Sequence, residues 1–178
     1  MTQLEIHDEQ WDFRAEESQG ELSETNMTKP RSVTHTTFVI ERAYPVAAGR
    51  VFAAFADPAK KRRWFVDDEA SDVEDFGMDF RVGGVERKRF RTQHGVCTNV
   101  TTYLDIVPDR RIVFAYTMSV GETRISSSQS TIELLAEGTE TNLVLTEQAA
   151  FFEGADGPRM REDGWRYLLG RLSQELEH

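Results

Sequence analysis

The pattern of apolar positions first predicts a strand and two short helices. Residues 34–44 are rich in threonine and β-branched residues, which is typical of a strand, and a proline follows them. Across residues 48–55, apolar side chains recur at i, i+3, i+4 and i+7, as on one face of a helix. Asp57 and Pro58 then supply the cap and the first turn of a second short helix that ends near Trp64.

Beyond these helices the pattern changes to strands. Residues 70–150 contain six runs with strand character, separated by short turns rich in glycine, proline and aspartate. Because the turns are short, we expect neighbouring runs to form hairpins and hence an antiparallel meander. The six predicted strands are Asp72–Phe80, Val85–Thr92, Val96–Val107, Arg111–Val120, Thr123–Ala136 and Thr141–Ala149.

A long amphipathic helix is predicted at the C-terminal end. Apolar residues at i, i+3, i+4, i+7 and i+11 run from Trp165, directly after Gly164, to Leu176. The fold class is therefore α+β, and this helix carries the long apolar stripe that can cover a seven-stranded sheet. A helix of about 10–12 Å diameter cannot fill the concavity of a strongly curved sheet, so we expect a cavity between the two.

Acidic residues are concentrated at the N-terminus. The 178-residue chain has a net charge of −10, and residues 1–26 contribute −7 through eight acidic residues and one arginine. Few residues there are apolar and they keep no regular period, so we expect residues 1–30 to form a disordered or loosely docked acidic arm. Met27 stands at the edge of the regular pattern, and a start of translation at this residue is a hypothesis that the sequence leaves open.

The composition excludes several classes of protein. No run of about 20 apolar residues could insert in a membrane, and no basic and apolar leader begins the chain. The single cysteine, Cys97, excludes an internal disulfide and a multi-cysteine metal cluster. We therefore expect a cytoplasmic protein without metal or cofactor. Nucleic acid is not an expected partner, because the chain is acidic and its basic residues are not interleaved with exposed aromatic ones.

Several stretches, in this order of elements, resemble a known superfamily. They are Tyr44-Pro45-Val46 with Val51-Phe52 and Phe55, Trp64-Phe65, Asp79–Gly84, Tyr103–Phe114, Leu143–Glu147, and Gly164-Trp165 with Leu168 and Leu172. Over residues 34–175 the chain resembles the START-like helix-grip superfamily, also called Bet v 1-like or SRPBCC. Within it, the chain resembles the branch named after the activator of the Hsp90 ATPase homologue 1. The resemblance implies a helix-grip domain over residues 31–176, with a curved seven-stranded antiparallel sheet wrapped on the C-terminal helix.

Candidate ligand contacts are mainly aromatic. By the resemblance, Trp64 and Trp165 lie at the rims of the cavity. Tyr103 and Tyr116 are the first candidates for polar contacts, because a buried hydroxyl group needs a partner. Packing in the core is the alternative for each residue. The full candidate set is Trp64, Phe80, Phe90, Tyr103, Phe114, Tyr116, Gln129, Phe151, Trp165 and Leu169.

Two polar stretches of the predicted strands each allow two interpretations. Arg87, Arg89 and Arg91 share one face of their strand. They either lie on a solvated outer face or clamp a carboxylate or phenolate. In residues 126–131, alternate positions point to opposite faces, and one of the two sets lines the cavity with polar groups while the other is solvated.

No catalytic signature is present, and two residues remain as candidates. Glu147 could act as a general base if its side of the last strand faced the interior, since burial makes a carboxylate more basic. His94 lies in a turn near Cys97, but a nucleophile pair also needs a third, orienting residue, which the sequence does not show.

The leading functional prediction is binding of a small hydrophobic or aromatic molecule in the cavity, within a stress or small-molecule response. One alternative is a cyclase- or hydrolase-like enzyme that uses the same cavity. Another is an Hsp90-type chaperone cofactor or protein-interaction module, which the name of the branch implies. A homodimer is a further hypothesis that the sequence leaves open.

Overall fold

The computed structural model describes residues 32–67, 72–92, 95–153, 155 and 157–178. The predicted acidic arm and the candidate His94 lie outside the described residues.

The order of elements is the one that the sequence predicts. The first are β1 (Thr34–Tyr44), α1 (Ala48–Ala56), α2 (Pro58–Lys61) and the π-helical turn η1 (Arg62–Val66). Six strands follow, namely β2 (Asp72–Met78), β3 (Val85–Thr92), β4 (Gly95–Val107), β5 (Arg111–Val120), β6 (Thr123–Glu137) and β7 (Glu140–Phe151). The last element is the long helix α3 (Gly157–Leu176).

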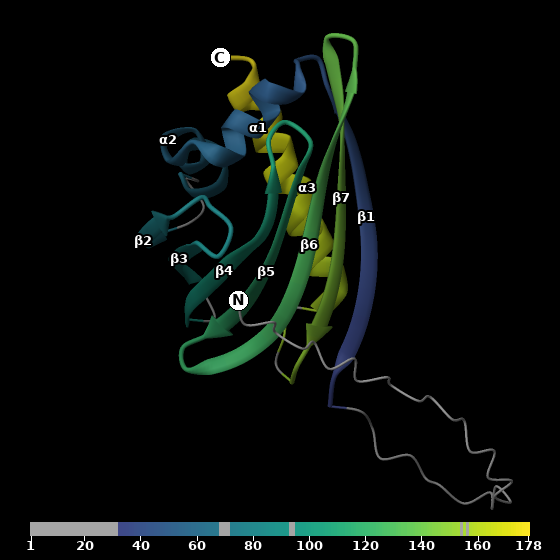
Figure 1. Cartoon of the computed structure of the whole chain (residues 1–178). Helices are drawn as coiled ribbons and strands as arrows, with labels where there is room; N and C mark the ends of the chain where they lie inside the picture. Colours follow the sequence, from purple (N-terminus) through teal and green to yellow (C-terminus); the bar gives the residue numbers. More distant parts are fainter. Residues whose placement is uncertain (1–31, 68–71, 93–94, 154, 156) are drawn as a thin grey trace, which may run out of the picture. The chain divides into compact units, whose positions relative to one another are not determined.

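The seven strands form one antiparallel sheet in the order β1-β7-β6-β5-β4-β3-β2. Strands β2 to β7 form a meander, and β1 pairs with β7, so that Ile40 lies opposite Leu145. Figure 1 shows curved strands, with α3 along one face of the sheet and α1 near the C-terminal end of α3. The predicted helix-grip α+β fold is confirmed.

Local sequence explains the two short helices that precede η1. In α1, Val51 and Phe55 turn one apolar face inward and are buried. Asp57 caps α2 as predicted, because its carboxylate accepts hydrogen bonds from the backbone nitrogens of Ala59 at 2.8 Å and Lys60 at 3.0 Å. The bond from Lys60, more than any other contact, holds the pKa of Asp57 below its ordinary value.

Helix α3 begins earlier than the sequence pattern predicts. The apolar period starts at Trp165, but the helix starts at Gly157, because the fixed φ of Pro158 suits a first helical turn. Gly164 is an exposed interior position of the helix, where glycine costs about 1 kcal/mol relative to alanine and is tolerated. The earlier start brings Arg161 onto the buried face, one turn before Trp165.

The core lies between α3 and the inner face of the sheet. Leu169 and Leu172 of α3 have no exposed surface, and neither do Leu143 and Leu145 of β7. Toward β3, β4 and β5 the packing is less complete, and a cavity remains there.

Candidate ligand-binding cavity

A cavity of about 230 Å³ lies between strands β3–β5, the α2–η1 segment and α3. Its apolar wall consists of Phe55, Trp64, Phe65, Phe80, Phe90, Ile112, Phe114, Met118, Met160, Trp165 and Leu168. An engineered cavity of about 150 Å³ holds benzene. The space is therefore suited to a ligand of one or two rings.

Most of the aromatic residues proposed from the sequence lie in this wall. Phe80 meets Tyr103 edge-on at a centroid distance of 4.9 Å, and Phe114 lies 6.3 Å from Tyr103 and 6.2 Å from Trp165. The candidates that line the cavity are Trp64, Phe80, Phe90, Tyr103, Phe114, Tyr116 and Trp165.

Gln129 lies away from the cavity, which corrects the expectation that it contacts a ligand. Its side chain is exposed on the outer face of β6, whereas Ser126, Ser128 and Ser130 are buried on the inner face. Both alternating sets are polar, so periodicity alone could not identify the inward one.

Two other candidates are buried beside the cavity but do not line it. Leu169 belongs to the core, and its backbone oxygen accepts a hydrogen bond from the hydroxyl of Tyr44 at 3.0 Å. Phe151 packs against Arg161, whose guanidinium carbon lies 5.1 Å from the ring centroid. Both are packing residues rather than wall residues.

The three arginines of β3 lie on the outer face of the sheet. They therefore cannot bind the carboxylate or phenolate of a ligand in this cavity. Arg87, Arg89 and Arg91 are exposed. Arg89 and Arg91 both bond the carboxylate of Glu74 on β2, with Arg89 Nε at 2.7 Å. The opposite face of β3 carries Glu86, which lines the cavity.

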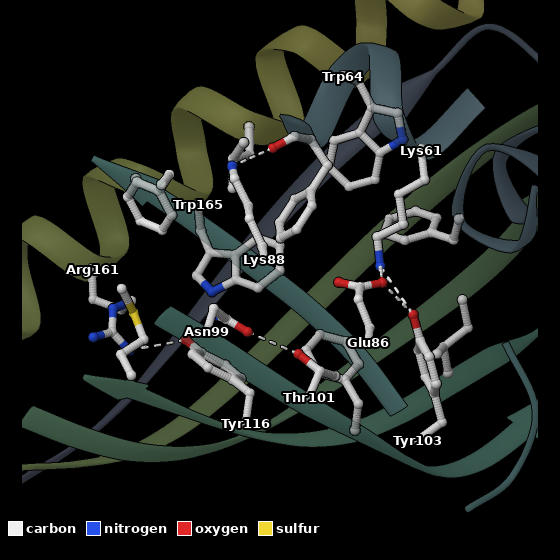
Figure 2. Close-up of a pocket in the computed structure, with 18 of the residues that line it drawn as sticks. Lys61, Trp64, Glu86, Lys88, Asn99, Thr101, Tyr103, Tyr116, Arg161 and Trp165 are labelled. Carbon is white, nitrogen blue, oxygen red and sulfur yellow. Dashed lines mark hydrogen bonds and ion pairs between the residues drawn. The ribbon is translucent and has the colours of Figure 1, made fainter. Parts of the chain in front are cut away.

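One end of the cavity holds a buried ion pair with a tyrosine. Lys61 Nζ lies 2.6 Å from Glu86 Oε2, and the hydroxyl of Tyr103 donates to the same oxygen at 2.6 Å. Lys61 also donates to the Tyr103 hydroxyl at 3.1 Å, as Figure 2 shows. Burial, and then the charge of Glu86, raise the pKa of Tyr103. The hydroxyl therefore stays protonated and acts as a donor.

The other end holds a second buried network around Glu147. This carboxylate has no exposed surface and accepts hydrogen bonds from Tyr116 at 2.5 Å, from Ser130 at 3.0 Å and from the indole nitrogen of Trp165. Arg161 lies 3.7 Å from it and donates to the Tyr116 hydroxyl at 3.0 Å. Burial, and then the charge of Glu147, raise the pKa of Tyr116, which Arg161 partly offsets.

These contacts bear on the hypothesis that Glu147 is a general base. Both of its oxygens already accept hydrogen bonds, and the side chain does not line the cavity. Glu147 is thus placed to join β7, β5, β6 and α3 rather than to meet a ligand. Cys97 is buried with its sulfur 3.8 Å from Thr92 Oγ1, and it does not line the cavity.

Polar side chains also lie between the two ends, on β3 and β4. Lys88 donates to the backbone oxygen of Phe65 at 2.6 Å and lies over the rings of Phe65 and Phe90. Thr101 donates to Asn99 Oδ1 at 3.0 Å. Figure 2 shows Asn99 and Thr101 between Tyr116 and Glu86, whereas Lys88 extends toward the helical side of the cavity.

Four charged residues of the wall were not predicted from the sequence, namely Lys61, Glu86, Lys88 and Arg161. Strand alternation could have found two of them, because Glu86 and Lys88 share the face of Phe90. Lys61 stands in a run of four basic residues, which is typical of a solvated helix face. Arg161 precedes the apolar period of α3 and gave no signal.

Neither a metal site nor a membrane span is apparent in the part of the chain that the structure describes. Within it, no three His, Cys, Asp or Glu side chains are grouped so that they could bind a metal ion. Among the same residues, no helix combines the length and the apolarity that a membrane span requires.

Comparison with protein families identifies the domain. The model of the family described as activator of Hsp90 ATPase homolog 1-like protein matches residues 45–177. The chain belongs to this family. The resemblance stated from the sequence is thereby confirmed for this AHSA1-like SRPBCC domain. A comparison with curated proteins finds no match.

Solved structures with the same fold include two from rhizobia. Protein Mll3558 of Rhizobium loti is 48% identical over 82% of this chain and 99% of its own, with a TM-score of 0.75. A putative uncharacterized protein of Rhizobium leguminosarum is 40% identical over 84% of this chain and 99% of its own, with a TM-score of 0.78. Protein CV1439 of Chromobacterium violaceum, at 24% identity over 80% of this chain and 97% of its own and a TM-score of 0.66, shares the fold.

Proposed function

We propose that this protein binds a small, largely apolar molecule in the cavity between β3–β5 and α3. The supporting observation is the cavity itself, of about 230 Å³, walled by aromatic and methionine side chains with buried polar groups at both ends. Protein interiors normally contain few voids larger than a water molecule. A largely apolar space with a few converging polar groups is typical of a ligand site.

The size of the cavity sets the expected affinity. A ligand that buries about 250 Å² of apolar surface gains about 6 kcal/mol at 25 cal/mol per Å². Each hydrogen bond adds about 1 kcal/mol, and the loss of translational and rotational freedom opposes binding. With a cost of about 4 kcal/mol for that loss, about 3–4 kcal/mol remains, so we expect dissociation constants on the order of 1 mM for one- or two-ring compounds.

Gly164 offers a direct test because it lines the cavity and a Cβ atom there would meet nothing within 4 Å. Gly164→Phe adds a ring at this point of the wall. Gly164→Ala is the matched control, since it changes the same helical position by a single methyl group.

The measurement is native mass spectrometry, together with thermal unfolding, against a library of one- and two-ring compounds. We expect bound compounds with the wild type and with Gly164→Ala, and loss of binding with Gly164→Phe. The proposal fails if no compound of the library binds the wild type.

A second candidate function is supported by the description of the family, which names an activator of the Hsp90 ATPase. A shared fold does not carry an activity with it, so this candidate needs its own test. The measurement is the ATPase rate of a bacterial Hsp90 with and without the purified chain. A rate that stays unchanged at saturating chain concentration dismisses this candidate.

A further inference from the structure

Glu86 presents one carboxylate oxygen to the cavity without a partner. Its Oε2 accepts hydrogen bonds from Lys61 and from Tyr103, both at 2.6 Å. Its Oε1 receives no hydrogen bond from any residue that the structure describes. The residue is only 2% exposed, and it lines the cavity.

The surroundings hold this carboxylate in a fixed orientation. Lys61 and Tyr103 both approach from the same side, and Lys61 compensates the charge of Glu86. Figure 2 shows the second oxygen pointing away from Lys61, toward the part of the cavity that Asn99 and Trp165 border. This oxygen is not among the fully enclosed side-chain atoms that lack a partner, so it is accessible from the cavity. A hydrogen-bond donor on a ligand would satisfy it.

We propose that Glu86 Oε1 is the acceptor that orients the ligand, and that the ligand is a neutral aromatic molecule with a hydroxyl group, such as a phenol. This inference rests on the proposed function and adds the chemical class of the ligand. The aromatic walls at this end, where Phe80 meets Tyr103 edge-on, fit a ring that carries the hydroxyl. A carboxylate in the same place would face the Glu86 oxygen and be repelled by it.

Three naphthalene compounds separate these alternatives by isothermal titration calorimetry. The first is 2-naphthol, the second is its methyl ether, which has the same rings without a donor, and the third is 2-naphthoate, which is anionic. We expect wild-type protein to bind 2-naphthol at least tenfold more tightly than the ether, and 2-naphthoate more weakly than either. Hydrogen bonds to a charged acceptor support a ratio of this size.

Two variants test whether Glu86 causes the preference for 2-naphthol over its methyl ether. Glu86→Gln replaces the carboxylate by an amide of the same shape, and it should reduce the ratio between 2-naphthol and the ether to less than threefold. Glu74→Gln is the matched control, because it makes the same change in an exposed carboxylate of the neighbouring strand β2, which does not line the cavity. It should keep the tenfold ratio.

The outcomes distinguish this inference from the proposed function. Equal binding of 2-naphthol and its ether by the wild type overturns the inference and leaves the proposed function standing. If Glu86→Gln still prefers 2-naphthol over the ether by the same ratio, the inference is likewise overturned and the proposed function stands. Should no naphthalene compound bind the wild type and the library also give no ligand, both proposals fail. If Glu86→Gln does not fold, the order of the three affinities in the wild type still decides.

Discussion

Removal of the charge on Lys61 tests whether the polar end of the cavity is dry. The side chains of Lys61 and Glu86 are 8% and 2% exposed, and their charged atoms lie 2.6 Å apart. Loss of one partner of a buried ion pair costs about 3–5 kcal/mol, because the other charge stays buried without compensation. Tyr103 still donates to Glu86 in a Lys61→Met variant. We therefore expect a loss of about 3 kcal/mol in the free energy of unfolding.

The assay is urea unfolding followed by circular dichroism, carried through a double-mutant cycle. Lys61→Met and Glu86→Leu should each destabilise, whereas the double variant should lie within about 2 kcal/mol of the wild type, since apolar pairs often replace buried ion pairs without loss. The coupling between the two sites should then exceed about 2 kcal/mol.

Arg89→Met on the outer face of the same strand is the matched control. Arg89 pairs with Glu74 at 2.7 Å, but the two side chains are 53% and 26% exposed. Exposed pairs contribute about 0–1 kcal/mol, so this variant should change stability by less than 1 kcal/mol. A loss as small for Lys61→Met would refute the reasoning, because it would mean that water solvates Glu86.

The remaining predictions concern the tyrosines, α3 and the Glu147 network. Burial raises the pKa of Tyr44, Tyr103 and Tyr116 above the ordinary value of 10.0. Because the unfolded chain then ionises at lower pH than the folded protein, the protonated hydroxyls contribute a stability that is complete below pH 10 and declines above it. Absorbance at 295 nm should show at most one of the four tyrosines ionising before the circular dichroism signal is lost; an earlier second ionisation contradicts the burial argument. Gly164→Ala should raise the free energy of unfolding by up to about 1 kcal/mol in urea titrations, and a decrease would mean that the methyl group clashes. Trp165→Phe removes one of three donors to Glu147 and should cost about 1–3 kcal/mol by the same measurement; a neutral result would show that the indole bond adds nothing.

The sheet could be predicted because residues close together in the sequence determine each of its hairpins. Each hairpin follows from a short turn between two strand-like runs, and six such runs leave few other arrangements. The pairing of β1 with β7 is not local, and it was not predicted; the resemblance to a known fold implied only a single seven-stranded antiparallel sheet. Period two along β5 then placed Phe114 and Tyr116 on one face, and both line the cavity.

The polar part of the site could not be predicted in the same way. Lys61 and Glu86 are 25 positions apart, and neither residue type is usually buried, so only the folded chain shows that they pair. Arg161 precedes the apolar period of α3, and its burial depends on the helix starting at Gly157. Apolar periodicity therefore predicts the apolar wall residues of a cavity but not the charged residues buried beside them.

The two ends of the cavity differ in one respect that assigns them different roles. At Glu147, both oxygens accept hydrogen bonds from residues of three different elements, so neither oxygen lacks a donor. At Glu86, both donors share one oxygen and the other oxygen has no donor among the described residues. A saturated network rigidifies the fold, whereas an unsaturated one beside an apolar space can discriminate between ligands. Substitutions at the Glu147 end should therefore change stability, and substitutions at the Glu86 end should change ligand preference.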